Sequence, residues 1–341
     1  MTTQRIASLE LGRVIAIIAV IAIHSQLMTT YPLFNSEPWL GNFINQLSRF
    51  AVPFFFITSG YFLQPKLSTS PKSTAWRYCR PLLYLWLVWS VVYLLAPFNL
   101  YQLSQQGWLA ERTGYWNYLA QNPINALLEG GMVHLWFLPA LIFAIAIIAV
   151  FEQAKKRQWL LGVAGAIYIY GVLAGSYQPL TEYSAPFFTR NGPFFSLLMV
   201  TIGYLVRQHR YTLTSMQALI VMLIGLVGHL TEAFVLSHFD IDFRIHDFLF
   251  STPLWGLGLF LLLLANPNWG NHPLIFAIAN MTLGIYVIHL LIIIYMNNIS
   301  GFNGLEGIAK DSLVFVGAIV VSVGLTYLLN KSPLKRLLFT R

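Results

Sequence analysis

The stretch Glu-Leu-Gly-Arg-Val-Ile-Ala-Ile-Ile-Ala-Val-Ile-Ala-Ile-His-Ser-Gln-Leu-Met-Thr-Thr, residues 10–30, is the first long apolar run of the chain. A membrane-spanning helix needs about 20 such residues. Two basic side chains interrupt the run, Arg13 and His24, eleven positions apart. This spacing puts both on one helix face, roughly 16 Å apart along the axis. Ionisable groups are costly inside a membrane, so the pair is a candidate for function, and a hydrogen-bonded core histidine is the simpler alternative.

The composition is that of a polytopic membrane protein. Hydrophobic residues make up 57% of the 341 residues and charged residues only 9%, whereas soluble domains contain about 25% charged residues. The formal net charge of +8 comes from short basic clusters between apolar runs. Such clusters set membrane orientation, so we do not expect nucleic-acid binding. The single cysteine, Cys79, excludes an intramolecular disulfide, and we interpret it as structural.

Ten apolar runs predict an all-α transmembrane bundle of about ten membrane helices, forming a single membrane domain over residues 1–341. Five of the 20 Lys and Arg residues fall in predicted outer segments and fifteen in inner ones, which predicts that both termini are cytoplasmic. We expect the longest outer segment, 98–132, to form short interfacial helices, which would act either as a lid over an acceptor site or only as anchors in the interface. The predicted spans are 11–30, 43–63, 81–97, 133–151, 159–176, 191–206, 213–237, 247–265, 273–296 and 312–329.

Polar side chains on the predicted inner half are candidates for binding an anion. Ser59 lies in a small polar notch of the second run, where a ligand or another backbone can approach closely. Arg77 and Arg80 precede Pro81, just before which we expect the third helix to begin. Their guanidinium groups, next to a helix N-terminus, would suit phosphate. The alternative is that they only anchor the helix at the membrane surface.

Other polar side chains lie deeper or nearer the outer side. His134 and Trp136 open the fourth run, either as interface residues or as the wall of an acceptor pocket. Glu232 lies within the seventh run, where a buried carboxylate must be paired, protonated or hydrated, so structural pairing is the alternative to a direct role. Tyr286 and His289 share a helix face in the ninth run. The sequence contains no metal-binding motif, and we predict no metal site.

Taken in order, these motifs resemble the acyltransferase 3 family of integral membrane acyltransferases, bacterial enzymes that mostly O-acylate extracytoplasmic glycans. The most specific motif is Arg13 and His24 separated by ten residues, with an acidic residue, Glu10, three positions before the arginine. One departure is Val14, where the family often has glycine. The size is similar to that of stand-alone members, such as the enterobacterial common antigen O-acetyltransferase type. The supporting motifs are Phe-Phe-Phe-Ile-Thr-Ser-Gly at 54–60, Arg77 with Arg80, His-Leu-Trp-Phe-Leu at 134–138 and Ile-Tyr-Val-Ile-His at 285–289.

The resemblance implies an acyl-CoA-dependent O-acyltransferase in the bacterial cytoplasmic (inner) membrane, in contact with membrane lipids. The implied donor is acetyl-CoA, bound from the cytosol. The residues expected to bind it are Arg13, Arg77, Arg80 and Ser59.

The resemblance also implies a role for each remaining candidate. His24 would act as the general base for the acceptor hydroxyl, with an acyl-histidine intermediate as a variant. Glu232 or His289 would orient His24 or relay the proton, and the sequence leaves this choice open. The acceptor would be a glycan or lipid-linked sugar at the outer side, in contact with His134, Trp136 and Tyr286.

A second class of function is compatible with the same residues. Buried Glu232, His229 and His289 would also suit a proton-coupled transporter or flippase. Matching broken helices in two halves of the chain would favour this alternative, and we find no clear internal repeat.

Overall fold

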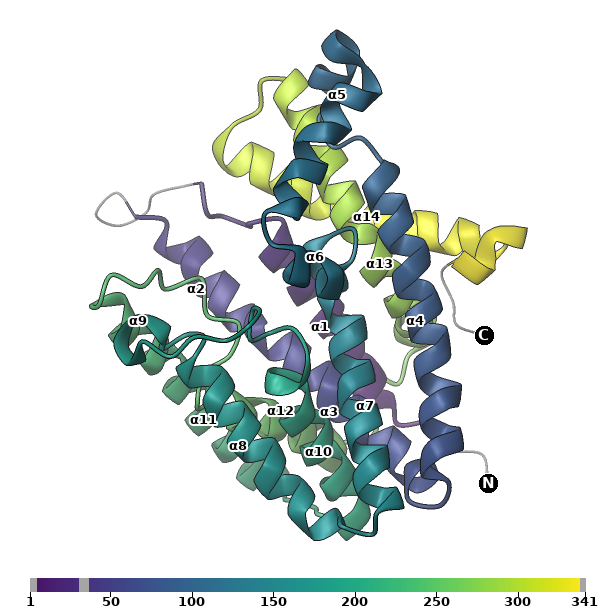
Figure 1. Ribbon diagram of the computed structural model, residues 1–341, viewed down its shortest axis with the longest axis vertical. Coiled ribbons are helices and arrows are strands. Elements are labelled where there is room, and N and C mark those ends of the chain that lie inside the picture. Colours follow the sequence, from purple (N-terminus) through teal and green to yellow (C-terminus); the bar gives the residue numbers. More distant parts are fainter. Residues whose placement is uncertain (1–4, 31–36, 338–341) are drawn as a thin grey trace. The chain divides into compact units, whose positions relative to one another are not determined.

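The computed structural model describes residues 5–30 and 37–337, and most of these residues are helical. Figure 1 shows the helices coloured along the sequence. The two chain ends, whose cytoplasmic location the charge bias predicts, lie outside the described residues. The helices are α1 (Ala7–His24), α2 (Trp39–Leu47), α3 (Ala51–Leu67), α4 (Pro71–Leu95), α5 (Leu100–Ala120), α6 (Pro123–Glu129), α7 (Phe137–Gln153), α8 (Leu160–Leu173), α9 (Gln178–Thr181), α10 (Pro193–His209), α11 (Ser215–Ser237), α12 (Thr252–Ala265), α13 (Pro273–Phe302) and α14 (Gly307–Asn330), with short 3₁₀ turns η1 (Ser48–Phe50), η2 (Val133–Trp136), η3 (Arg157–Trp159) and η4 (Pro333–Leu337).

The chain is an all-helical, multi-pass membrane protein. In the described part of the chain, six helical segments are long and apolar enough to cross a membrane. The other four predicted spans fall on α3, α8, α10 and α12, which have only 14 to 17 residues. At ~1.5 Å per residue a 14-residue helix covers roughly 21 Å, less than the ~30 Å of a hydrocarbon core. The six segments are Ala7–His24, Pro71–Leu95, Val133–Gln153, Ser215–Ser237, Pro273–Phe302 and Gly307–Asn330.

The chain divides into two compact units that alternate along the sequence. Unit 1 comprises Met1–Val20, Gln46–Arg80 and Ala140–Thr282, and unit 2 comprises Ile21–Asn45, Pro81–Pro139 and Leu283–Arg341. The four short apolar helices all belong to unit 1. The prediction of a single membrane domain stays a prediction.

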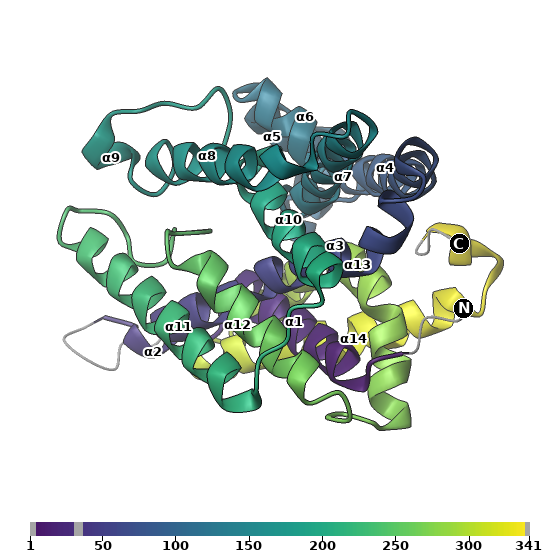
Figure 2. The same ribbon diagram turned by 90° about the horizontal axis from the view of Figure 1, so that it is seen from below.

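Unit 1 is built around a close crossing of α3 and α10, which lie side by side in Figures 1 and 2. A Cβ atom added at Gly60 of α3 would overlap the backbone carbonyl of Val200, and one added at Gly203 of α10 would overlap that of Ile57. Small residues at both crossing points allow the two backbones to touch, as in many membrane helix pairs. The polar notch of the second run is therefore a packing surface at Gly60.

Helix α4 begins ten residues earlier than predicted. Proline suits the first position of a helix, and Pro71 takes that position, with the Thr74 amide donating to the carbonyl of Ser70 over 3.0 Å. The helix then continues through Pro81. Arg77 and Arg80 consequently lie beyond the first turn and are exposed. The prediction that a helix N-terminus assists phosphate binding at Arg77 and Arg80 is wrong, because the positive end of the helix dipole acts only within the first turn.

Helix α1 ends at His24, whereas the sequence places this imidazole near the middle of a longer helix. The Leu27 amide donates to the Ala22 carbonyl and the Gln26 amide to the Ile23 carbonyl, both over 3.2 Å. Gln26 has a left-handed backbone with φ of 52°. This is the Schellman arrangement that terminates helices. The turn sets His24 at the very end of α1.

In unit 2, the predicted outer segment forms helices, as expected. A kink at Gly107, with φ of 82°, divides α5, and α6 follows it. Arg112 is fully buried, pairs with Glu111 and stacks on Phe98 with 4.2 Å between its guanidinium carbon and the ring centroid. Burial opposes ionisation of Glu111, but hydrogen bonds from Arg112 and two backbone amides outweigh it and hold the pKa of this carboxyl below its usual range.

Candidate active site

Three histidines from three segments of unit 2 meet in the protein interior. His24 ends α1, His134 lies in η2 and His289 lies in α13. The ring centroids of His24 and His289 are 5.3 Å apart, those of His134 and His289 are 5.1 Å apart, and those of His24 and His134 are 6.3 Å apart. His134 and His289 are 1% and 0% exposed. We call these three residues the histidine cluster.

The turn before His134 brings it to the cluster. Gly130 has a φ of 68°, a conformation that favours glycine. A Cβ atom at Gly131 would overlap the backbone carbonyl of Ser90 in α4. These two glycines let the chain pass directly against α4 before η2 begins.

The backbone of α13 fixes the tautomer of His289. Its Nδ1 lies 2.6 Å from the carbonyl oxygen of Tyr286. A carbonyl can only accept, so Nδ1 carries the proton and, in the neutral ring, Nε2 keeps a lone pair. Nε2 is buried and has no hydrogen-bond partner among the described residues. The ring is therefore arranged as a proton acceptor.

Two tyrosines tie the cluster to the surrounding backbone. The hydroxyl of Tyr286 donates to the main-chain carbonyl of His134. The ring of Tyr93 lies 5.0 Å from that of His134, centroid to centroid. Its hydroxyl donates to the carbonyl of Val287 over 2.9 Å and accepts from the amide of Leu291 over 3.1 Å. The Tyr93 hydroxyl thus links two backbone groups that lie one helical turn apart in α13.

Tyr93 was not predicted from the sequence. The available signal was a tyrosine within an apolar helix, because a buried tyrosine hydroxyl requires a hydrogen-bond partner. Arg112 extends the same network, since its Nη1 donates to the backbone carbonyl of Tyr93 over 3.3 Å. Helix α5 is thereby linked to the backbone next to the cluster.

Glu232, one of the two residues predicted to assist His24, has its described contacts within unit 1. Its carboxylate accepts hydrogen bonds from the backbone amides of Phe250 and Ser251 over 2.9 and 2.7 Å, and from the hydroxyl of Tyr177 over 3.2 Å. These amides immediately precede α12, where a negative charge is stabilising. Glu232 therefore connects α11 to the start of α12.

His229, the other histidine weighed for transport, has both ring nitrogens paired. Nδ1 lies 2.9 Å from Oγ1 of Thr252 and Nε2 lies 2.9 Å from Oε1 of Gln46. The ring is 0% exposed. These contacts are those of a satisfied core histidine in unit 1.

The predicted donor-binding residues of unit 1 differ in their surroundings. Arg13 donates to Glu10 over 3.0 Å and to Oγ1 of Thr282 over 2.8 Å. Ser59 donates to the carbonyl one turn earlier in its own helix, over 2.8 Å. Arg77 and Arg80 are exposed on α4, as described above. In unit 2, the predicted acceptor residue Trp136 is only 9% exposed and contacts Phe137.

A second charged network, also unpredicted, lies in unit 1. Asp247 accepts from Nη1 of Arg49 over 2.5 Å and from Nη1 of Arg190 over 3.2 Å, and Nη2 of Arg49 donates to the carbonyl of Arg244 over 2.6 Å. These residues come from three distant segments that the sequence does not connect.

In the described part of the chain, no group of three His, Cys, Asp or Glu side chains has an arrangement that could hold a metal ion.

The amino-acid sequence of the chain is similar to parts of two longer curated proteins and matches one protein family. It is 26% identical to an amino-acid racemase of Enterococcus faecalis, covering 96% of this chain and 46% of that protein. It is 29% identical to a serine/alanine racemase of Enterococcus gallinarum, covering 81% of this chain and 39% of that protein. The chain thus spans less than half the length of these curated relatives, and no solved structure matches it. The model of the acyltransferase 3 family, described as an acyltransferase domain, matches residues 6–331, and the chain therefore belongs to this family.

Proposed function

We propose that the chain is an acyl-CoA-dependent O-acyltransferase of the bacterial cytoplasmic membrane. It transfers an acyl group, in the simplest case acetyl from acetyl-CoA, to a hydroxyl of a glycan or lipid-linked sugar at the outer side. Membership of the family supports acyl transfer. The observation that carries the proposal is the histidine cluster, because attack by a hydroxyl needs a base and Nε2 of His289 is a buried acceptor without a partner among the described residues.

In the proposed reaction, His24 removes the proton from the acceptor hydroxyl as its oxygen attacks the thioester carbonyl. The new C–O bond forms, the C–S bond breaks, and the CoA thiolate leaves and takes up the proton. We assign the relay or orienting role to His289, whose ring lies 5.3 Å from that of His24. We choose His289 and not Glu232 for this role because the carboxylate of Glu232 already accepts hydrogen bonds from the amides at the start of α12.

His134 and two aromatic residues would shape the acceptor side. His134 and Tyr286 are held together by the hydrogen bond from the tyrosine hydroxyl, so they form one rigid wall next to His289. Trp136 extends this wall from the same 3₁₀ turn. On the donor side, exposed Arg77 and Arg80 have guanidinium groups suited to bidentate phosphate contacts.

The direct test is transfer of labelled acetyl from acetyl-CoA in membranes that contain the wild type, His24→Ala or His289→Ala. We expect both variants to lose at least about 100-fold in rate, the range of general acid–base catalysis. His238→Ala, which removes an exposed histidine, is the matched control. Undiminished transfer by well-expressed His24→Ala protein would exclude His24 as the base.

A second candidate function is proton-coupled transport of a small solute. The names of the curated relatives favour an amino acid as that solute, because these proteins are named for acting on amino acids. Uptake of labelled serine or alanine by proteoliposomes under a pH gradient tests this function. Gradient-dependent uptake without acetyl transfer would replace the first proposal by the second.

A further inference from the structure

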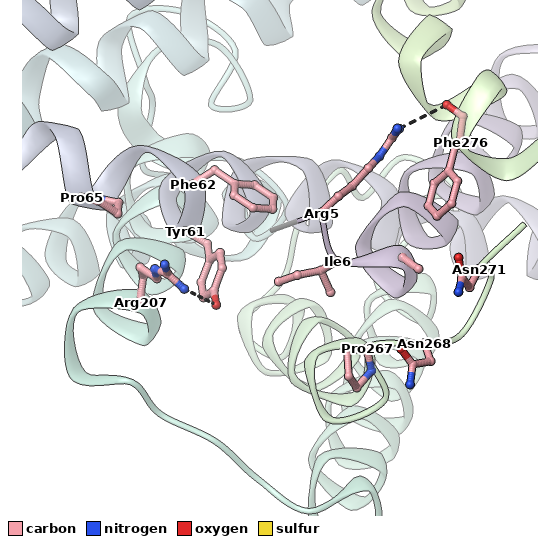
Figure 3. A pocket seen from close by; sticks show the side chains of 11 residues that line it. Arg5, Ile6, Tyr61, Phe62, Pro65, Arg207, Pro267, Asn268, Asn271 and Phe276 are labelled. Carbon is pink, nitrogen blue, oxygen red and sulfur yellow. Dashed lines mark hydrogen bonds between the residues drawn. The ribbon is translucent and has the colours of Figure 1, made fainter. Parts of the chain in front are cut away.

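Unit 1 contains a cavity of about 480 Å³ that none of the predicted site residues lines. Its walls come from the start of α1, the second half of α3, the end of α10, the turn after α12 and the start of α13. Figure 3 shows the lining side chains, with Arg207 next to Tyr61 and Arg5 next to Phe276. A second cavity of about 630 Å³ adjoins it, because the two share five lining residues: Ile6, Tyr61, Pro65, Arg207 and Pro267.

All the charges on the described walls of these cavities are positive. Arg5 and Arg207 line the first cavity, and the second adds Arg210; no carboxylate is among the described lining residues. Glu10 pairs with Arg5 from outside the lining and offsets one of these charges. All three arginines lie in segments that the charge bias predicts to be cytosolic. We call the first cavity the arginine cavity.

Both arginines of the arginine cavity are held in place yet keep N–H groups to donate. Arg207 donates through Nη1 to the hydroxyl of Tyr61 over 2.9 Å. Arg5 donates through Nε to Glu10, and through Nη2 to the carbonyl of Phe276 over 3.2 Å and to Asn280 over 2.9 Å. Among the described contacts, Nε and Nη2 of Arg207 and Nη1 of Arg5 are not used. A guanidinium fixed by one hydrogen bond is pre-organised to form others.

The rest of the lining combines apolar surface with neutral polar groups. Tyr61, Phe62 and Phe276 supply aromatic surface, and Asn268 and Asn271 supply side-chain amides. A cavity of this volume lies within the range of roughly 300–1,000 Å³ that is usual for small-molecule sites. Guanidinium groups from separate segments match an anion with several oxygen acceptors, and the aromatic surface matches an attached base or acyl-glycerol group.

We propose that the arginine cavity binds a phosphate ester at the side of the membrane predicted to be cytosolic. The ester belongs either to a soluble nucleotide, the acyl-CoA donor included, or to the headgroup of an anionic lipid. Arg207 and Arg5 contact the phosphate oxygens, and Phe62 and Phe276 contact the attached group. The inference rests on the cavity and does not require the proposed transferase activity.

The experiment measures binding to the purified full-length chain in two arms. The soluble arm uses CoA, adenosine 3′,5′-bisphosphate and, as a probe without phosphate, adenosine. The lipid arm counts phosphatidylglycerol retained from mixed phosphatidylglycerol–phosphatidylcholine nanodiscs by native mass spectrometry. We expect a phosphate probe to bind in at least one arm. Arg207→Gln should weaken that binding about tenfold or more, since it removes charge-assisted hydrogen bonds.

Three comparisons make the result specific to the cavity. Lys156→Ala removes an exposed charge from another predicted cytosolic segment and should leave binding unchanged. Arg207→Lys keeps the charge and should retain more binding than Arg207→Gln. Arg77→Ala tests the donor site expected from the sequence, and the arginine cavity predicts a smaller effect there than at Arg207. The melting temperature of each variant without ligand shows whether it is folded.

The outcomes separate this inference from the proposed function. Suppose that folded Arg207→Gln and Arg5→Gln proteins still bind CoA fully, and that phosphatidylglycerol retention does not depend on Arg207. This result would overturn the proposed binding site in the arginine cavity and leave the assignment of acyl-CoA as donor intact. Phosphatidylglycerol retention that depends on Arg207, without any CoA binding, would support phosphate-ester binding in the arginine cavity. The same result would overturn the assignment of acyl-CoA as the donor. No binding of either phosphate probe to the wild type would overturn the cavity.

Discussion

Replacing Tyr93 by phenylalanine tests whether the histidine cluster depends on a side chain outside it. The hydroxyl of Tyr93 bridges the carbonyl of Val287 and the amide of Leu291. These two groups lie four residues apart, so both belong to one turn of α13. His289 lies midway between them in the sequence. Removing the hydroxyl therefore removes the link between α4 and the turn of α13 that carries His289.

The two expected effects differ in size. The variant loses the hydrogen bonds of one hydroxyl, while the two backbone groups can still pair with each other, so we expect a net loss of about 1 kcal/mol of unfolding free energy. The fully buried ring keeps its packing, because phenylalanine has the same ring. Loss of this link lets the turn that carries His289 shift, and a misplacement of about 1 Å at a reacting group costs roughly 100-fold in rate. Acyl transfer should therefore fall far more than stability does.

The assay measures acetyl transfer and thermal unfolding on the same detergent-purified preparations. Tyr84→Phe is the matched control, because Tyr84 lies on the same helix and its ring is 49% exposed. We expect the control to resemble the wild type in both measurements. A Tyr93→Phe protein that melts earlier but transfers acetyl at the wild-type rate would refute the positioning role of Tyr93.

Three further predictions concern stability. Gly203→Ala should destabilise unit 1 by about 1–3 kcal/mol, because the added methyl overlaps the backbone of Ile57. The control is Gly165→Ala in α8, which has open space around it and should be neutral or stabilise by up to ~1 kcal/mol. Equal melting temperatures of the two variants would contradict the packing argument. Gln26→Gly should stabilise by about 1 kcal/mol, since glycine has no penalty at positive φ, and a lower melting temperature would count against the helix-end assignment. Because the pKa of Glu111 is lowered in the folded state, its contribution to folding stability is complete above the unfolded-state pKa of about 4.3 and is lost as the pH falls through the folded-state pKa. Tryptophan fluorescence of α5 followed against pH measures this loss of stability. A pH dependence that persists in Glu111→Gln would belong to another group.

Much of the helical content was readable from apolar length, but helix ends were less so. The end of α1 at His24 follows from the left-handed backbone of Gln26, and glutamine is not a residue that signals this conformation. The early start of α4 had a visible signal, a proline at position 71. The apolar window beginning at Pro81 masked it, because hydropathy detects the membrane core and not the full helix.

The candidate site was predictable as a set of residues and not as an arrangement. His24, His134, Tyr286 and His289 were each selected from local motifs, and the structure brings these four together in unit 2. Spacing does not place them together, since their separations exceed 100 residues except within α13, and the resemblance left open whether His289 or Glu232 assists His24. Glu232 was selected because a membrane carboxylate is rare, and its hydrogen bonds show that a helix start can satisfy such a group.

The imidazole of His289 is held by a backbone carbonyl, and this choice of partner has a chemical consequence. A carboxylate beside His289 would fix the same tautomer but would add a full charge, and an isolated charge in low-dielectric surroundings is expensive. The Tyr286 carbonyl fixes Nδ1–H without a net charge. The lone pair on Nε2 is thus set by the fold of α13, and the negative charge needed during acyl transfer arrives with the substrate's own oxygen and sulfur atoms. Whatever moves the 286–291 segment must then change the chemistry of His289, which makes the backbone of α13 as important to the site as the imidazoles themselves.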